Sequence, residues 1–166
     1  MNIAVQLGPP ADTVPGVDYR WDTDTDILTA RLDIPAATAG SPGSVDLEGA
    51  DGSWVILELS RGRLQGLEVA VWPDVHRRAT LQPPAVVEDG CVSIPLVPAP
   101  AGPAALEVDT SIIAESDEDE RVIYFRVGAK RPARSVRVAR DLLVDLDPQQ
   151  RIAGLWLLNV PPFPPT

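Results

Sequence analysis

The chain has 166 residues, of which 45% are apolar, and this is enough to build one packed core. Its 14 basic and 24 acidic side chains give a formal net charge of −10, which disfavours autonomous binding to nucleic acid because phosphate-driven affinity needs a basic surface. The single cysteine, Cys91, has no partner for an internal disulfide, and the single histidine, His76, leaves no His/Cys set for zinc. We therefore expect a protein without a metal or cofactor in a reducing, cytoplasmic compartment.

Targeting segments are not apparent along the chain. The opening residues lack a basic stretch and break at Pro9 and Pro10, so we expect no signal peptide. The most apolar later stretch, 92–106, is interrupted by prolines and is shorter than the roughly 18 apolar residues of a spanning helix. Arginine is abundant and Lys130 is the only lysine, a composition that suggests a GC-rich bacterial source.

Prolines and glycines separate the apolar runs throughout the chain, and this spacing predicts short strands rather than helices. The first clear run places Leu28, Ala30 and Leu32 on one face of a strand, after a turn at 22–26. Further strands are expected within 85–97 and 106–114, and another at 3–7. In chain order the eight main predicted strands are 27–33, 44–48, 54–59, 64–71, 121–127, 134–139, 142–146 and 152–159.

An internal repeat organises these strands. The segment 21–32 aligns with 116–127, so that Arg31 falls on Arg126, and 44–47 and 63–67 align with 135–138 and 151–155. The repeat predicts one compact domain, 1–166, made of repeat one (19–73), connecting strands (74–114), repeat two (115–160) and a Pro-rich tail (161–166).

The predicted fold is all-β, with two pseudo-symmetric antiparallel four-strand meanders that form either a sandwich or a barrel. The residues expected inside share the period-two pattern of their strands. They are Leu28, Leu32, Val55, Leu57, Leu67, Val69, Ile123, Phe125, Val127, Leu142, Val144, Leu146, Leu155 and Leu157.

Each repeat carries short strand and turn motifs. In repeat one they are Trp21-Asp22, Asp26, Leu28, Arg31-Leu32 and Gly66-Leu67-Glu68-Val69. In repeat two they are Tyr124-Phe125-Arg126-Val127, Leu143-Val144-Asp145-Leu146-Asp147 and Arg151-Ile152-Ala153-Gly154-Leu155. With these motifs the repeat resembles the mostly bacterial domain-of-unknown-function family numbered twenty-two eighty-three, which has an aromatic-Asp pair, an Asp-x-Leu strand, an acidic turn and an apolar-x-Gly-apolar-Glu strand. Repeat one departs from that pattern at Ser60-Arg61-Gly62, and repeat two departs from it at Arg121 and Trp156. The resemblance implies a strand-and-turn fold and assigns no activity and no catalytic residue.

Two acidic segments are candidate cation sites. Alternate carboxylates at 22–26 resemble the start of a calcium loop, but Ile27 stands where such a loop needs glycine, so the alternative is an Asx turn that holds a hairpin. The run 115–120 carries five carboxylates, and its alternative interpretation is a solvated loop.

Seven cations lie between Arg121 and Arg140 in this acidic chain. One interpretation is a docking face for an acidic partner or a phosphate-bearing ligand. The other is that these side chains pair with the acidic run 115–120. The candidate contact residues are Arg126, Arg131, Arg134, Arg137 and Arg140.

No catalytic motif is recognisable: His76 has no nucleophile at a known spacing, and Cys91 lies in an apolar setting. The Pro-rich tail presents Phe163 either to a partner groove or to its own domain. The sequence thus favours a non-catalytic protein-interaction or regulatory module, monomeric because the second repeat replaces a dimer partner. The alternative is a small-molecule binding protein or weak enzyme with a site between the repeats.

Overall fold

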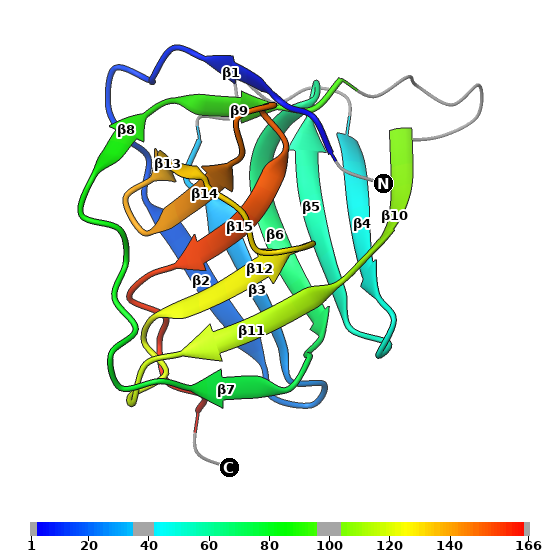
Figure 1. Ribbon diagram of the computed structural model, residues 1–166, viewed down its shortest axis with the longest axis vertical. Coiled ribbons are helices and arrows are strands. Elements are labelled where there is room, and N and C mark those ends of the chain that lie inside the picture. Colours follow the sequence, from blue (N-terminus) through cyan, green and yellow to red (C-terminus); the bar gives the residue numbers. More distant parts are fainter. Residues whose placement is uncertain (1–2, 35–41, 96–103, 165–166) are drawn as a thin grey trace.

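The computed structural model describes residues 3–34, 42–95 and 104–164, and this part of the chain is all-β. Its 15 strands form two sheets and none of the described residues lies in a helix, as the spacing of prolines and glycines predicts (Figure 1). Consequently, no described segment is a helix that is long and apolar enough to cross a membrane.

Sheet one contains eight strands. Along its main path the order is β1-β9-β6-β5-β4-β10, while β3 also pairs with β6 and β2 pairs with β3. The pairing is antiparallel except between β4 and β10. The strands are β1 (Gln6–Gly8), β2 (Val17–Asp22), β3 (Ile27–Leu32), β4 (Pro42–Gly49), β5 (Trp54–Ser60), β6 (Arg63–Val71), β9 (Cys91–Ser93) and β10 (Ala104–Thr110).

Sheet two contains seven strands in the order β7-β11-β12-β15-β14-β13-β8. Its two outermost pairs, β7 with β11 and β8 with β13, are parallel, and the inner pairs are antiparallel. The strands are β7 (Val75–Arg77), β8 (Val87–Asp89), β11 (Ile112–Ser116), β12 (Ile123–Val127), β13 (Arg134–Ala139), β14 (Leu142–Leu146) and β15 (Ile152–Leu157).

The strand order is not that of a simple meander. A meander would place the first predicted strand of each repeat beside the second, whereas β3 lies beside β6 and β12 lies beside β15. Short turns fix only the hairpins between consecutive strands, such as β5–β6 and β14–β15. The two edges of β3 are taken by β2 and β6, and those of β12 by β11 and β15, so neither strand pairs with the next predicted one.

The chain crosses between the two sheets from β6 to β7, from β8 to β9 and from β10 to β11. The chain leaves β10 in sheet one, passes through Ser111, whose carbonyl accepts a 2.8 Å hydrogen bond from the Gly128 N–H, and enters sheet two as β11 (Figure 1). Near the start of the chain, the Val5 N–H donates to the Gln150 carbonyl (2.8 Å), the Ile152 N–H donates to the Ile3 carbonyl (3.0 Å), and β1 then joins sheet one. These crossings tie the sheets together along the backbone.

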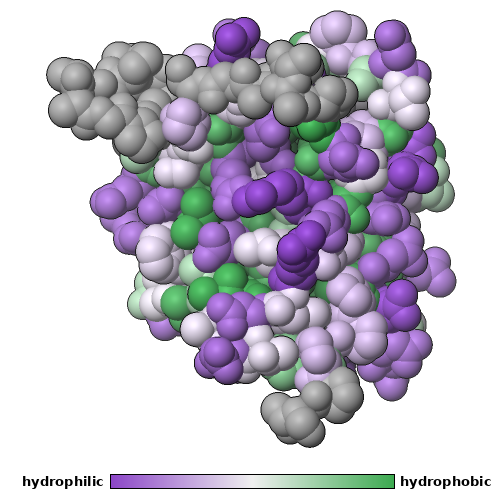
Figure 2. Space-filling view, turned by 180° about the vertical axis from the view of Figure 1, so that it is seen from behind, coloured by the Kyte–Doolittle hydropathy of each residue, from purple (hydrophilic) through white to green (hydrophobic). Residues whose placement is uncertain are grey.

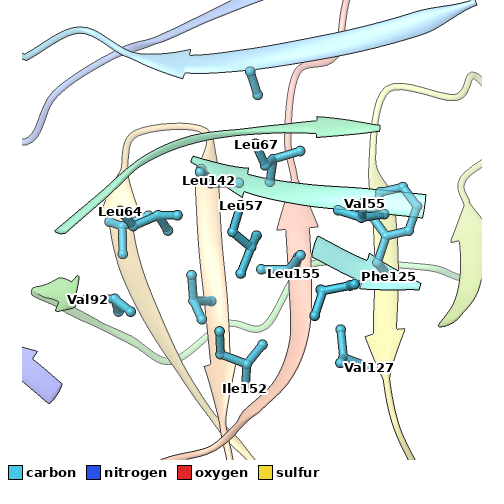
Figure 3. Packing of buried hydrophobic residues seen from close by; sticks show 14 of the residues in the cluster. Val55, Leu57, Leu64, Leu67, Val92, Phe125, Val127, Leu142, Ile152 and Leu155 are labelled. Atoms are coloured by element: carbon cyan, nitrogen blue, oxygen red, sulfur yellow. The ribbon is translucent and has the colours of Figure 1, made fainter. Parts of the chain in front are cut away.

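Side chains from both sheets meet in one core. Figure 3 shows labelled residues of β5 and β6 projecting into the same space as those of β12, β14 and β15. The residues predicted to lie inside are all buried. Alternate burial is seen in strands such as β5 and β12, whereas every residue of β14 and β15 is buried, so these two central strands do not follow the period-two pattern. Seen from behind, the molecule presents mainly hydrophilic side chains with apolar ones scattered among them, as expected for the outer face of a sheet (Figure 2).

Candidate binding pocket

A pocket of about 560 Å³ lies at the end of the molecule where the β2–β3 turn, β7 and the β11–β12 turn meet (lower part of Figure 1). The chain that follows β15 forms a further side of it. We call this cavity the end pocket. Its lining residues in the described part of the chain are Trp21, Asp26, Trp72, Val75, Arg77, Ser116, Glu118, Asp119, Glu120, Ile123, Pro161, Pro162 and Phe163.

Aromatic rings line part of the end pocket, and we refer to Trp21 and Trp72, which lie on β2 and directly after β6 rather than in the segment after β15, as the aromatic wall. The rings of Trp21 and Trp72 stack with their centroids 5.7 Å apart, and Phe163 meets Trp21 edge-on at 5.2 Å. The Trp72 indole N–H donates to the Asp26 carbonyl at 2.8 Å, which fixes this ring to the β2–β3 turn. The wall is therefore held by hydrogen bonding as well as by ring contacts.

Four acidic residues also line the end pocket, and we refer to Asp26, Glu118, Asp119 and Glu120 as the acidic rim. In the part of the chain that the structure describes, Glu120 pairs with Arg77, while the other three side chains form no salt bridge. The rim thus carries more negative charge than Arg77 neutralises, and its field favours a cation in the cavity.

The β11–β12 turn holds three of these carboxylates in place. The Asp117 carboxylate accepts hydrogen bonds from the backbone N–H groups of Arg121 (2.9 Å) and Val122 (3.1 Å). Glu120 adopts a left-handed conformation with φ of 57°, and its N–H donates to the Asp117 carbonyl. This bonded turn presents the side chains of 118–120 at the mouth of the end pocket.

Ser116, at the end of β11, supplies a polar group to the same cavity. Its side chain is fully buried, and its Oγ has no hydrogen-bond partner. Buried hydroxyl groups are normally hydrogen-bonded, and leaving one unpaired costs about 1–3 kcal/mol. No base contacts this Oγ, so Ser116 is not arranged as an activated nucleophile.

The segment 22–26 forms an Asx turn, which is the alternative to a calcium loop that the sequence analysis gave for it. The Asp22 carboxylate accepts from the Asp24 N–H at 3.0 Å, and the Asp26 N–H donates to the Asp22 carbonyl at 2.8 Å. Among the described residues no group of three or more His, Cys, Asp or Glu side chains is arranged to hold a metal ion.

The acidic run 115–120 has basic partners other than those expected. Glu115 pairs with Arg78 and Glu120 pairs with Arg77. The prediction that this run pairs with the arginines of 121–140 is therefore wrong. The reason is that β7 lies parallel to β11 at the edge of sheet two and brings Arg77 and Arg78 alongside.

Arg131, one of the predicted contact residues, ties together the chain around β15. Its guanidinium donates to the Asp147 carboxylate at 2.9 Å and to the carbonyls of Val127, Ala129 and Ile152 at 2.8–2.9 Å. Asp147 is almost fully buried, and although burial alone raises the pKa of a carboxyl, the hydrogen bonds from the Arg151 N–H, Arg131 and the Gln149 N–H lower it to about 2. Arg131 therefore stabilises the fold.

Arg134 and Arg137 face the neighbouring strand β8. Arg134 pairs with Glu88 at 2.5 Å, and Arg137 pairs with Asp89 at 2.7 Å. The ion pair between Arg137 and Asp89 raises the pKa of Arg137 and lowers the pKa of Asp89. Their charges are thus matched within the chain.

The remaining two predicted contact residues lie apart from these. Arg126 is on β12, which β15 and β14 separate from β13, and its buried Nε has no hydrogen-bond partner. The backbone of Arg140, just after β13, donates to the Pro15 carbonyl at 2.8 Å. The five arginines therefore do not converge on one concave site.

The sequence analysis did not predict that Trp21, Trp72 and Ser116 lie at the same cavity. The chain contains four tryptophans, and this was the available signal, since indole rings concentrate at binding sites. Only the pairing of distant strands brings these residues to one end of the molecule. A comparison of the sequence with protein-family models finds no match, and a comparison with curated proteins finds none either.

Proposed function

We propose that the chain is a non-catalytic interaction module that binds a positively charged segment of another protein in the end pocket. The observation that carries this proposal is one cavity that combines an aromatic wall, an acidic rim with three unpaired carboxylates and the unpartnered Ser116 Oγ. Aromatic faces and carboxylates both attract a cation, the first through the ring quadrupole and the second by charge. A basic side chain would interact with the aromatic rings and with the carboxylates at the same time.

A small-molecule ligand is the second candidate. This candidate is favoured by the position of the end pocket between the two repeats. Trp21 and Trp72 belong to repeat one, while Ser116 and Ile123 belong to repeat two. Pockets between two structural units commonly hold small ligands. A compound that remains bound to the purified protein in native mass spectrometry, and leaves when Trp72 is changed to Ala, would support this candidate.

Charge reversal on the acidic rim tests the leading proposal. The probe is an acetylated and amidated octalysine peptide, and binding is followed by calorimetry at low salt. Asp119→Lys should weaken binding at least tenfold, because a like charge then faces the peptide. The matched control is Asp12→Lys, which makes the same charge change on an exposed residue that does not line the end pocket. Equal affinities of the two variants would contradict the proposal.

We further propose that the two halves are pseudo-symmetric copies of one unit. The orders β3-β6-β5-β4 and β12-β15-β14-β13 support this, since equivalent strands pair in the same sequence. Arg31 pairs with Gly66 and Arg126 pairs with Gly154, so aligned residues occupy matching register positions. The resemblance to the family numbered twenty-two eighty-three, the monomeric state and the cytoplasmic location remain parts of this proposal, along with the absence of nucleic-acid and membrane partners.

A further inference from the structure

The segment that follows β15 lies along the aromatic wall. Val160 is fully buried, and its N–H donates to the Arg121 carbonyl at 3.0 Å, which anchors the start of the segment. The Trp21 indole N–H then donates to the Pro161 carbonyl at 2.9 Å, and Phe163 packs edge-on against the Trp21 ring. Residues 161–163 are therefore held against Trp21 at two points, one polar and one aromatic, and form a side of the end pocket.

A proline-rich ligand makes contacts of the same two kinds with an aromatic surface. Proline-rich segments are stiff, lose little entropy on binding and dock on aromatic side chains. A prolyl carbonyl is free to accept a hydrogen bond because no strand partner uses it, and here Trp21 supplies the donor. The chain thus shows which backbone chemistry the aromatic wall accepts.

The same segment leaves the rest of the end pocket unsatisfied. Val160–Pro164 carries no charged side chain, so it cannot neutralise Asp26, Glu118 or Asp119. Phe163 remains 40% exposed, and the Ser116 Oγ stays without a partner. The segment contacts the aromatic wall but does not neutralise the carboxylates of the acidic rim.

We infer that the ligand of the end pocket is a proline-rich segment that carries a lysine or arginine, and that residues 161–163 compete with it from within the chain. This inference rests on the proposed function. A tethered segment acts at an effective concentration in the millimolar range, so an external ligand needs the added attraction of its cation for the acidic rim to displace it. Displacement would release Phe163 from Trp21.

The test compares two peptides of equal charge on the full chain. Acetyl-RVPPFPPR-amide repeats the chain's own proline segment with an arginine at each end, and acetyl-RVAAFAAR-amide replaces its four prolines by alanine. Binding is followed by the NMR signal of the Trp21 indole N–H. We expect the proline peptide to shift this signal and to bind at least fivefold more tightly than the alanine peptide.

Two variants test the competition. Phe163→Ala removes the aromatic contact of the internal segment, and we expect the proline peptide to bind about threefold to tenfold more tightly to this variant than to the unchanged protein. Trp21→Phe keeps a ring but removes the indole donor and should weaken binding; because this variant lacks the indole N–H signal, its affinity is measured by calorimetry alongside that of the unchanged protein. An additional variant, Val86→Ala, alters an exposed residue outside the end pocket and should bind as the unchanged protein does.

The outcomes separate this inference from the proposed function. If both peptides bind equally and Asp119→Lys weakens both, the pocket recognises charge alone, and the inference fails while the proposed function stands. If Phe163→Ala leaves the affinity for the proline peptide unchanged, the internal segment is not a competitor. If neither peptide and no octalysine binds to any variant, both proposals fail.

Discussion

Two glycines in equivalent register positions are constrained by different neighbours. A Cβ on Gly66 would lie 2.4 Å from the backbone oxygen of Ala30, whereas a Cβ on Gly154 would lie 2.6 Å from the ring of Tyr124. We expect Gly66→Ala to destabilise the fold by about 3 kcal/mol and Gly154→Ala by about 1–2 kcal/mol, because a side chain moves more readily than a paired strand. Urea unfolding measures both.

The Tyr124 ring is the internal control for this prediction. In a Tyr124→Ala background the contact made by the new methyl group disappears, so Gly154→Ala should become nearly neutral while the cost of Gly66→Ala stays unchanged. An unchanged cost of Gly154→Ala in that background would show that the ring does not impose the glycine.

Glu68, on the outer face of sheet one, has a raised pKa because it is partly buried and lies near Glu58 and Asp46. The folded state therefore binds this proton more tightly than the unfolded state, and stability is lost as the pH rises and the carboxyl ionises. Glu68→Gln should stabilise the protein at pH 7 by about 0.5 kcal/mol.

A thermal melt at several pH values checks the sign of this effect. The advantage of Glu68→Gln should vanish below about pH 4, where the original carboxyl is protonated in both states. Asp12→Asn removes one negative charge from an exposed loop residue and should leave the melting temperature almost unchanged at every pH. A destabilised Glu68→Gln variant at pH 7 would show that the charge is compensated in the fold.

At the scale of elements, the β11–β12 and β14–β15 hairpins use related turns of different strength. Asp117 and Asp147 each accept backbone hydrogen bonds from residues later in the turn, but only Asp147 also accepts from the side chains of Arg131 and Arg151. Asp147→Asn should therefore cost about 2–4 kcal/mol, and Asp117→Asn about 1 kcal/mol. Urea unfolding at pH 7 compares the two.

The low pKa of Asp147, about 2, adds a dependence on pH. Since the folded-state pKa is depressed, the stabilisation is complete above the unfolded-state pKa of about 4 and is lost as the pH falls towards 2. The stability difference between the unchanged protein and Asp147→Asn should shrink over this window. A constant difference down to pH 2 would mean that the charge of Asp147 is not the source of its effect.

Strand positions could be predicted from the sequence, and strand partners could not. The predicted strands 134–139 and 142–146 coincide with β13 and β14 because their apolar residues and flanking turns are local signals. Strand β7 was missed because Val75, His76 and Arg77 are all exposed, and a short exposed strand has no pattern of buried apolar residues. Strand β2 was also missed, although apolar and aromatic residues alternate with charged ones along Val17–Asp22, which is the period-two signal of a strand.

The candidate sites show the same limit. Arg126 and Arg137 are close in sequence, but two intervening strands in sheet two separate β12 from β13. Trp21 and Trp72 are distant in sequence, yet their rings stack. Density of charge along the chain is therefore a poor guide to a site in a protein dominated by long-range strand pairing, whereas individual turns such as 22–26 follow from local hydrogen-bonding chemistry.

For the whole molecule, the edge strand β10 bears on the oligomeric state. Its exposed Glu107 and Asp109 place charges along an open edge of sheet one, and charged edges prevent strands of two molecules from pairing. We expect a particle of 17.8 kDa in light scattering, and concentration-dependent dimers when both residues are changed to Val. Asp12→Val with Asp33→Val makes a comparable change on exposed loop residues and should stay monomeric.

Residues 3–5 pair with residues 150–152, and during synthesis this pairing cannot form until residues 150–152 have been added to the chain. Ile3 and Val5 are buried, and their backbones hydrogen-bond to Ile152 and Gln150, which the ribosome adds nearly 150 residues later. At a translation rate of about 5–20 residues per second, these apolar side chains remain without their partner strand for several seconds or longer. Until then, Ile3 and Val5 lack the contacts that bury them in the folded protein.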